Sequence, residues 1–191
     1  MKKIMFNDKF GLTDAVLQGR KTMTRRLVGK RMTDDDIKAY LKGYTELANK
    51  AAPYKIGEVV AVAQNYRDVY EELKRTHGSS SRVTREFFHK YVQAGRMPVS
   101  NKMFVRADLM PHQIKITDIK VERLQDISDK DCLREGLIKG LITYGIRSKG
   151  GCLLTYLTPR EAFADLIDAV SGKGTWERNP WVFAYSFELC E

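Results

Sequence analysis

The chain has 191 residues, of which 43% are hydrophobic and 30% charged, which is typical of one folded domain and argues against a disordered chain. No apolar run approaches the roughly 20 residues of a membrane helix, so we expect no membrane partner. The first apolar run, residues 4–6, ends at Asn7 and Asp8, which is too early for a secretory signal. The sequence therefore predicts a cytoplasmic protein.

The cysteines and histidines do not form a metal-binding or redox motif. The three cysteines are odd in number and widely spaced, and the three histidines lack the spacing of metal ligands. We therefore expect no disulfide scaffold, no bound metal and no cofactor. The residues concerned are Cys132, Cys152, Cys190, His77, His89 and His112.

The formal net charge of +9 is concentrated in two segments. Residues 1–31 contain nine basic and two acidic side chains, and residues 73–106 contain eight basic and one acidic. If the two segments meet in space, they form a patch suited to a polyanion such as RNA or DNA. The alternative interpretation is an ordinary solvated surface.

The first elements in the chain are short and separated by turns. We expect a buried strand at residues 4–6 and then a helix at residues 12–17, which Gly19 ends. A basic turn is expected at residues 20–26. Three aspartates at its start and the helical spacing of its apolar residues predict a helix over residues 34–50.

The middle of the chain combines a buried strand with two charged helices. Residues 59–63 are apolar on both faces, which predicts a central strand. Helices are expected over residues 67–75 and 84–94, on either side of a Gly-Ser segment. We interpret them as a basic helical insertion at about 65–100 within a single domain, 1–191.

A long strand in the second half of the chain changes the phase of its apolar pattern. Ile114 and Ile116 share one parity, whereas Ile119 and Val121 share the other. A bulge or bend near Thr117-Asp118 would reconcile the two halves, and such bends suit a strand that wraps a small barrel.

Two helices and a final strand complete the pattern. Ser128 and Asp131 resemble a capping box for a helix that ends at Glu135, and Thr158-Pro159-Arg160-Glu161 opens a second helix. Strict alternation over residues 181–189 predicts the last strand. The mixture predicts an α+β fold in which the sheet takes the form of a barrel.

The candidate chemical motif is residues 19–26, which contain four cations and two hydroxyls. Arg20, Arg25 and Arg26 supply donors for phosphate oxygens, and the Thr22 hydroxyl can orient them. Across a tight turn, Lys21 and Thr24 can converge as a neutral amine base and a hydroxyl nucleophile. The alternative is a basic surface turn without chemistry.

At this point the sequence resembles the ASCH domain, a branch of the PUA-like superfamily, and in particular a longer KTxTRR branch of bacteria and phages. The resemblance covers most of the chain except roughly residues 65–100 and 138–158. It rests on Gly19-x-Lys21-Thr22-x-Thr24-x-Arg26, Lys55-Ile56-Gly57-Glu58-Val59, Val121-Glu122-Arg123-Leu124-Gln125-Asp126-Ile127 and Asn179-Pro180-Trp181-Val182-Phe183.

The resemblance implies a PUA-like β-barrel with peripheral helices and a cleft for RNA or modified nucleosides. Small relatives hydrolyse the amide of N4-acetylcytidine with a Lys, a Thr and a Glu, which correspond here to Lys21, Thr24 and Glu135. The family arginine corresponds to Arg26. Trp176 is a candidate for stacking on a base, and packing at the barrel mouth is its alternative role.

Three functions follow as hypotheses. The first is an RNA- or modified-nucleotide-binding domain with ligand contacts from Arg20, Thr22, Arg25, Arg26 and Trp176. The second is an amidohydrolase that removes acyl groups from N4-acylcytidine, and the third is a nuclease. The two basic segments favour a polyanion as the ligand, whereas Lys21, Thr24 and Glu135 together would permit hydrolysis. The sequence does not predict an oligomeric state.

Overall fold

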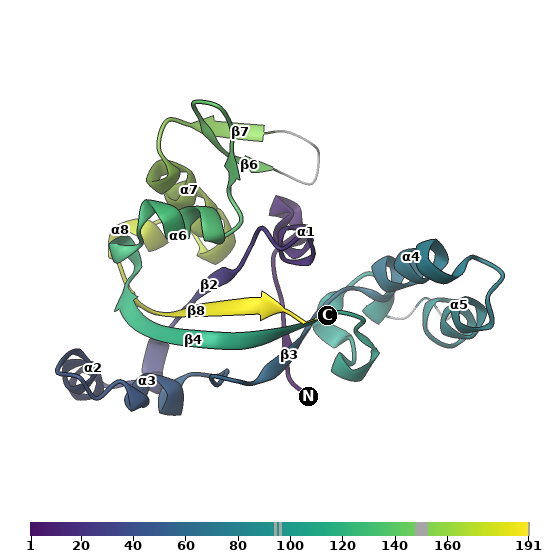
Figure 1. Ribbon diagram of the computed structural model, residues 1–191, viewed down its shortest axis with the longest axis horizontal. Helices are drawn as coiled ribbons and strands as arrows, with labels where there is room; N and C mark the ends of the chain where they lie inside the picture. Colours follow the sequence, from purple (N-terminus) through teal and green to yellow (C-terminus); the bar gives the residue numbers. More distant parts are fainter. Residues whose placement is uncertain (94, 96, 148–152, 191) are drawn as a thin grey trace. The chain divides into compact units, whose positions relative to one another are not determined.

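The computed structural model describes residues 1–93, 95, 97–147 and 153–190 (Figure 1). The chain divides into two compact units. Unit 1 comprises Met1–Phe6 and Val59–Gln113, and unit 2 comprises Asn7–Glu58 and Ile114–Glu191. The helical insertion expected at about 65–100 falls within unit 1, and the chemical motif falls within unit 2.

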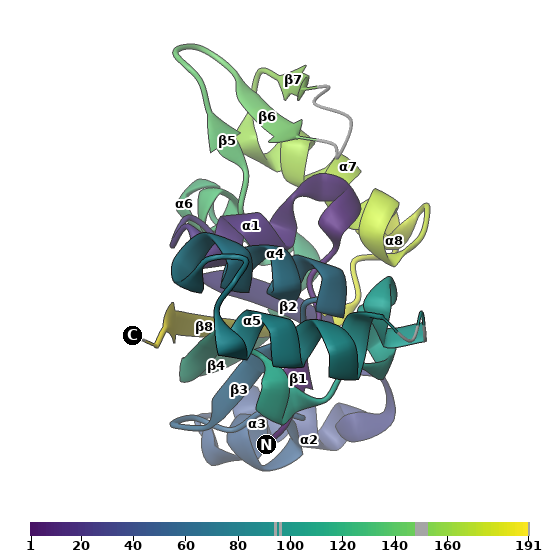
Figure 2. The same ribbon diagram turned by 90° about the vertical axis from the view of Figure 1, so that its right-hand side faces the viewer.

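Unit 1 combines a parallel strand pair with helices. β1 (Lys3–Ile4) pairs with β3 (Val59–Val62), so that Ile4 lies opposite Val62. α4 (Tyr66–His77) and α5 (Arg82–Phe87) lie side by side, and a π-helical turn over Phe88–Val92 continues α5 (Figure 2). Tyr66 of α4 packs into an apolar core with the end of β3.

Unit 2 is organised around the strand at the end of the chain. β8 (Trp181–Leu189) pairs antiparallel with β4 (Gln113–Arg123) on one side and with β2 (Met23–Leu27) on the other. The strand predicted for residues 181–189 is confirmed, but both of its faces are buried over Val182–Tyr185 rather than one face alone.

Helices cover both sides of these strands in unit 2. α2 (Asp34–Leu41) and α3 (Glu46–Ala51) lie on one side (Figure 1). α6 (Asp129–Arg134) and α7 (Pro159–Ser171) lie on the other. The candidate chemical motif therefore has helical neighbours from distant parts of the chain.

A bulge in β4 confirms the phase change predicted from the sequence. The pairing with β8 shifts between Ile116 and Asp118, at the expected position. As a result, the isoleucines and the valine before and after the bulge face one side, where they are buried against β8. The pairs are Ile114 with Leu189, Ile116 with Phe187, Ile119 with Tyr185 and Val121 with Phe183.

Residues 138–147 and 153–156, for which the sequence predicts no elements, contribute a second antiparallel sheet to unit 2. Its strands are β5 (Ile138–Lys139), β6 (Tyr144–Arg147) and β7 (Leu153–Tyr156), with β6 in the centre. β6 and β7 contact α7, as Figure 2 shows. Short helices α1 (Leu12–Leu17) and α8 (Thr175–Arg178) complete the unit.

The helix ends follow the predicted capping signals, with one exception. The capping box of Thr158 and Glu161 opens α7, and the Ser128 hydroxyl accepts from the Asp131 N–H at the start of α6. The single helix expected over residues 34–50 is wrong. The chain breaks into α2 and α3 at Gly43, where φ is +109°, a conformation that L side chains rarely adopt.

Two further expectations about the sheet need correction. The basic turn expected at residues 20–26 is largely the strand β2. The described strands form open sheets and are not closed into a barrel. Instead of pairing with another strand, the Thr22 N–H just before β2 donates to the carbonyl of Arg134 at the end of α6. The α+β class itself is confirmed.

Among the described residues, no helix combines the length and the apolar character needed to cross a membrane. Cys132 and Cys190 are free thiols, and Cys132 is fully buried. Burial raises the pKa of the Cys132 thiol to about 12, so it stays protonated and unreactive at neutral pH. Cys152 lies outside the described residues.

Candidate functional site

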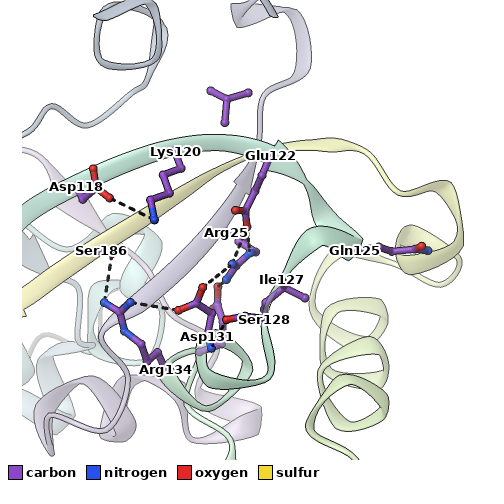
Figure 3. A network of polar contacts seen from close by, with 12 residues as sticks. Arg25, Asp118, Lys120, Glu122, Gln125, Ile127, Ser128, Asp131, Arg134 and Ser186 are labelled. Carbon is purple, nitrogen blue, oxygen red and sulfur yellow. Dashed lines mark hydrogen bonds and ion pairs between the residues drawn. The ribbon is translucent and has the colours of Figure 1, made fainter. Parts of the chain in front are cut away.

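A network of charged side chains lies where β2, β4 and α6 meet in unit 2 (Figure 3). At its buried end, the Lys21 Nζ donates to the Glu135 Oε2 at 2.6 Å and to the Glu135 backbone oxygen at 2.8 Å. The two side chains are only 2% and 6% exposed. A charge removed from water to this extent needs a partner of opposite charge, and Lys21 and Glu135 are such partners for each other.

Arg25 is the second cation of the network and binds two carboxylates. Its Nη1 donates to the Glu135 Oε1 at 3.0 Å, and its Nε and Nη2 donate to the Glu122 Oε1 at 2.9 and 2.7 Å. The Asp131 Oδ2 lies 3.8 Å from Nη2. Figure 3 shows the Arg25 guanidinium between the strand β4 and the helix α6.

Arg134 extends the network to the surface. Its guanidinium bonds to Asp131 at 3.2 Å, to the Thr22 hydroxyl at 3.1 Å and to the Ser186 hydroxyl at 3.2 Å. Its side chain is 35% exposed. Further along β4, Lys120 lies 4.0 Å from Asp118 and is largely open to solvent (Figure 3). The network therefore has a buried end and an exposed, partly cationic rim.

The charges of the network balance. Among the described residues, its ion pairs join the cations Lys21, Arg25 and Arg134 to the carboxylates Glu122, Asp131 and Glu135. Balanced, hydrogen-bonded charges tolerate burial, whereas the removal of one partner leaves an uncompensated charge. The network joins β2, β4 and α6, and it places oriented ion pairs beneath the rim.

The backbone positions the two ends of the Lys21–Glu135 pair. The Lys21 N–H donates to the carbonyl of Ala15 in α1. Gly136, with φ of +103°, turns the chain directly after Glu135, and a Cβ there would lie 3.3 Å from the Ala15 Cβ and 3.4 Å from the Lys21 Cβ. Only glycine fits this close approach without displacement.

The two buried cations differ in their acid–base behaviour. Burial lowers the pKa of the Lys21 ammonium, and the attraction of Glu135 opposes this effect only in part. Burial also disfavours the charge of Arg25, but Glu135 and Glu122 outweigh it and raise the pKa of the guanidinium. Arg25 is therefore a permanent charge, and Lys21 is the cation of the pair that can lose its proton.

The structure brings Lys21 and Glu135 together but not Thr24. Thr24 lies opposite Tyr185 in the β2–β8 pairing, and Arg25 lies opposite Ala184. Because side chains alternate along a strand, Thr24 shares the sheet face of Tyr185, while Arg25 reaches α6 from the other face. There is no tight turn between Lys21 and Thr24, since the chain is already paired with β8 at Thr22.

The expected ligand-binding residues have different surroundings. Arg25 is buried in the network, so its guanidinium is not available to a phosphate. Arg20 is exposed and bonds to the Gln18 side chain at 3.0 Å, and the Thr22 hydroxyl accepts from Arg134. Arg26 is half-buried on the sheet face of Thr24.

Trp176 packs within unit 2. Its ring meets Phe163 edge to face with centroids 6.1 Å apart, and the Arg160 guanidinium lies 5.5 Å from its centroid. Its backbone N–H donates to Asp168, and its carbonyl accepts from Gln125. These contacts agree with the packing role that the sequence left open as an alternative.

Sequence reasoning missed Glu122, Asp131, Arg134 and Lys120. A signal for the strand residues existed, because Lys120 and Glu122 occupy the parity opposite Ile119 and Val121. Charged residues at alternate strand positions indicate a second, polar sheet face. No short-range pattern connects that face with α6.

Comparison with known protein families, with curated proteins and with solved structures finds no match for this chain. Within the described ranges, no group of three or more His, Cys, Asp or Glu side chains is arranged to hold a metal ion. The functional argument therefore depends on the geometry and charge of unit 2.

Proposed function

We propose that this chain is an RNA- or modified-nucleotide-binding protein of the ASCH type, related to the PUA-like proteins. The observation that carries the proposal is the rim of the charged network in unit 2. There the Arg134 guanidinium lies beside the hydroxyls of Thr22 and Ser186, and Lys120 lies on the adjacent strand β4.

The chemistry of this rim suits a phosphodiester backbone. Guanidinium and ammonium groups neutralise phosphates, and hydroxyls donate to phosphate oxygens. Lys115 and Lys120 are exposed on the same outer face of β4, because the bulge between them keeps Ile114 and Ile116 before it, and Ile119 and Val121 after it, on the opposite, buried face. The buried network beneath holds Arg134 in place through Asp131.

The test is binding of single-stranded RNA across a salt series. We expect log K to fall linearly with log salt, and the double variant Lys115→Ala/Lys120→Ala to bind more weakly. Each phosphate that the variant no longer neutralises should flatten the slope by about 0.7, with little change in sequence preference. Fluorescence anisotropy with a labelled oligonucleotide measures both quantities.

The matched control is Lys38→Ala/Lys42→Ala, which removes the same charge from α2 and the residue after it, on the other side of the strands. It should leave the slope close to that of the wild type. No RNA affinity at low salt, or an equal effect of both double variants, contradicts binding at this rim.

The second candidate function is hydrolysis of N4-acylcytidine, and the contact between Lys21 and Glu135 favours it. Burial lowers the pKa of Lys21, which favours the neutral amine that a general base requires, and a well-placed base contributes roughly 10²–10⁴-fold to the rate. Thr24 is the proposed nucleophile. It would have to reach a substrate from the opposite sheet face, which makes this the weaker candidate.

Release of acetate from N4-acetylcytidine tests this second function. Thr24→Val should abolish the release, while Thr24→Ser, which keeps the hydroxyl, should retain part of it. A circular dichroism spectrum equal to that of the wild type controls for folding. If the wild type leaves N4-acetylcytidine and longer acyl analogues intact, the hydrolase function is excluded.

A further inference from the structure

Unit 2 contains a cavity of about 270 Å³ on the α2–α3 side of the strands. It lies between the 3-10 turn Gly29–Arg31, the start of α2 and the end of α3. None of its lining residues belongs to the charged network or to the proposed RNA-binding rim. They are Arg31, Met32, Asp36, Leu47, Lys50 and Ala51.

Two cations of the cavity differ from those of the charged network in having no ion pair among the described residues. Both side chains, Arg31 and Lys50, are exposed to solvent, and the Lys50 ammonium attracts the Asp36 carboxylate from beyond ion-pair distance. Arg25, in the same unit, has three carboxylates around it. The cationic groups of the cavity are thus available to an external anion.

The carboxylate of the cavity already has partners of its own. The Asp36 Oδ2 accepts from the Thr33 backbone N–H and hydroxyl, both at 2.8 Å, in the capping box of α2. These hydrogen bonds, together with the weaker attraction of Lys50, lower the pKa of Asp36, so it keeps its negative charge at neutral pH. The lining therefore has a net charge of one positive unit, which suits a monoanion better than a dianion.

The remaining lining is apolar. Met32 is buried at 6% exposure, and Leu47 and Ala51 are half-buried on one face of α3. The volume equals that of roughly nine water molecules. A ligand therefore needs a compact apolar body for this lining and an anionic group for the two cations.

We propose that this cavity binds a small monocarboxylate with a compact apolar body, such as an aromatic acid. The carboxylate would pair with Arg31 and Lys50, and the apolar body would contact Met32, Leu47 and Ala51. The proposal is independent of RNA binding, because it uses other residues on the other side of the strands.

The test is titration of the isotope-labelled full chain by NMR with three probes. Benzoate has both the carboxylate and the compact apolar body. Benzamide has the same shape without the negative charge, and acetate has the charge without the apolar body. We expect saturable shifts at cavity residues with benzoate, and affinities about tenfold lower for benzamide and acetate. Absence of saturation with benzoate, or equal affinity for benzamide, overturns the proposal.

Three cavity variants and one control variant locate the binding. Arg31→Gln and Lys50→Gln should each weaken benzoate binding about tenfold, and Lys42→Gln, an exposed cation outside the cavity, should have no effect. Ala51→Leu fills the cavity and should abolish binding, with the amide spectrum as the check of folding. Unchanged binding by the two cavity-cation variants, or equal weakening by Lys42→Gln, overturns the proposal.

Discussion

Glu135 compensates two buried cations at once, because its Oε2 accepts from Lys21 and its Oε1 from Arg25. Glu135→Gln keeps the size of the side chain but removes the charge. We expect the free energy of unfolding to fall by about 3–5 kcal/mol, since two cations lose their shared buried carboxylate. Urea denaturation followed by circular dichroism measures the decrease.

Glu46→Gln is the matched control for this substitution, because Glu46 is exposed at the start of α3. Its effect should stay within about 0.5 kcal/mol. A comparably small decrease for Glu135→Gln would show that the network adds little to stability.

The lowered pKa of Lys21 predicts how the stability of the protein changes with pH in alkaline solution. The pKa of Lys21 is lowered in the folded state, so between that value and 10.5 the unfolded chain binds more protons at this position. Stability therefore rises with pH over this window, by at most about 1.4 kcal/mol per pH unit. The unfolding free energy of the wild type minus that of Lys21→Met should increase with pH and level off near 10.5.

The direction in which this free-energy difference changes with pH shows which of two effects on the Lys21 pKa is the larger. Burial acts to lower the pKa, and Glu135 acts to raise it. A difference that falls as pH rises would mean that the attraction of Glu135 dominates. Because both proteins share every other titrating group, including Cys132, the difference cancels those contributions.

Among the secondary-structure elements, the junction between α6 and α1 depends on Gly136. Gly136→Ala combines an unfavourable φ of +103° with a contact of 3.3 Å to Ala15. Gly172→Ala, at the end of α7, has a similar φ of +105° but nothing within 4 Å. Comparison of the two alanine variants therefore separates the destabilisation caused by backbone strain from that caused by crowding of the added methyl group.

Both alanine variants should be destabilised by about 1–3 kcal/mol through backbone strain. Gly136→Ala should be destabilised by about 1–3 kcal/mol more, because the added methyl group displaces α1 or Lys21. Thermal unfolding of both proteins measures the difference. Equal destabilisation would contradict the tight packing of α6 on α1.

The elements differ in how far local sequence predicts them. α7 is predictable because Thr158, Pro159 and Glu161 form a complete N-terminal signal within a single turn. β2 is not, since the polar residues at the centre of Met23–Leu27 resemble a basic turn. It is a strand because β8 supplies the partner, more than 150 residues further along the chain.

For the molecule as a whole, hydrogen exchange should rank the elements by their burial. β8 is bonded on both sides within unit 2, and Phe183 and Tyr185 are fully buried. β7 lies at the edge of its sheet, with Leu153 and Leu154 exposed. Local opening exposes β7 amides, whereas β8 amides require global unfolding.

We expect the amides of Phe183 and Tyr185 to exchange at least about 100-fold more slowly than those of β7. Exchange followed by NMR in the native state measures both sets. Equal protection of the two strands would indicate that β7 opens only with the whole unit.

Features that depend on near neighbours along the chain follow from the sequence without the structure. The bulge in β4, the alternation of β8 and the capping of α7 each depend on residues within about ten positions of one another. The charged network, in contrast, exists only in the folded chain. Lys21 and Glu135 are 114 positions apart, and Arg25 and Glu122 are 97 apart. Whether such side chains attract, lose water or shift their pKa depends on distance and burial in space, which no local pattern encodes.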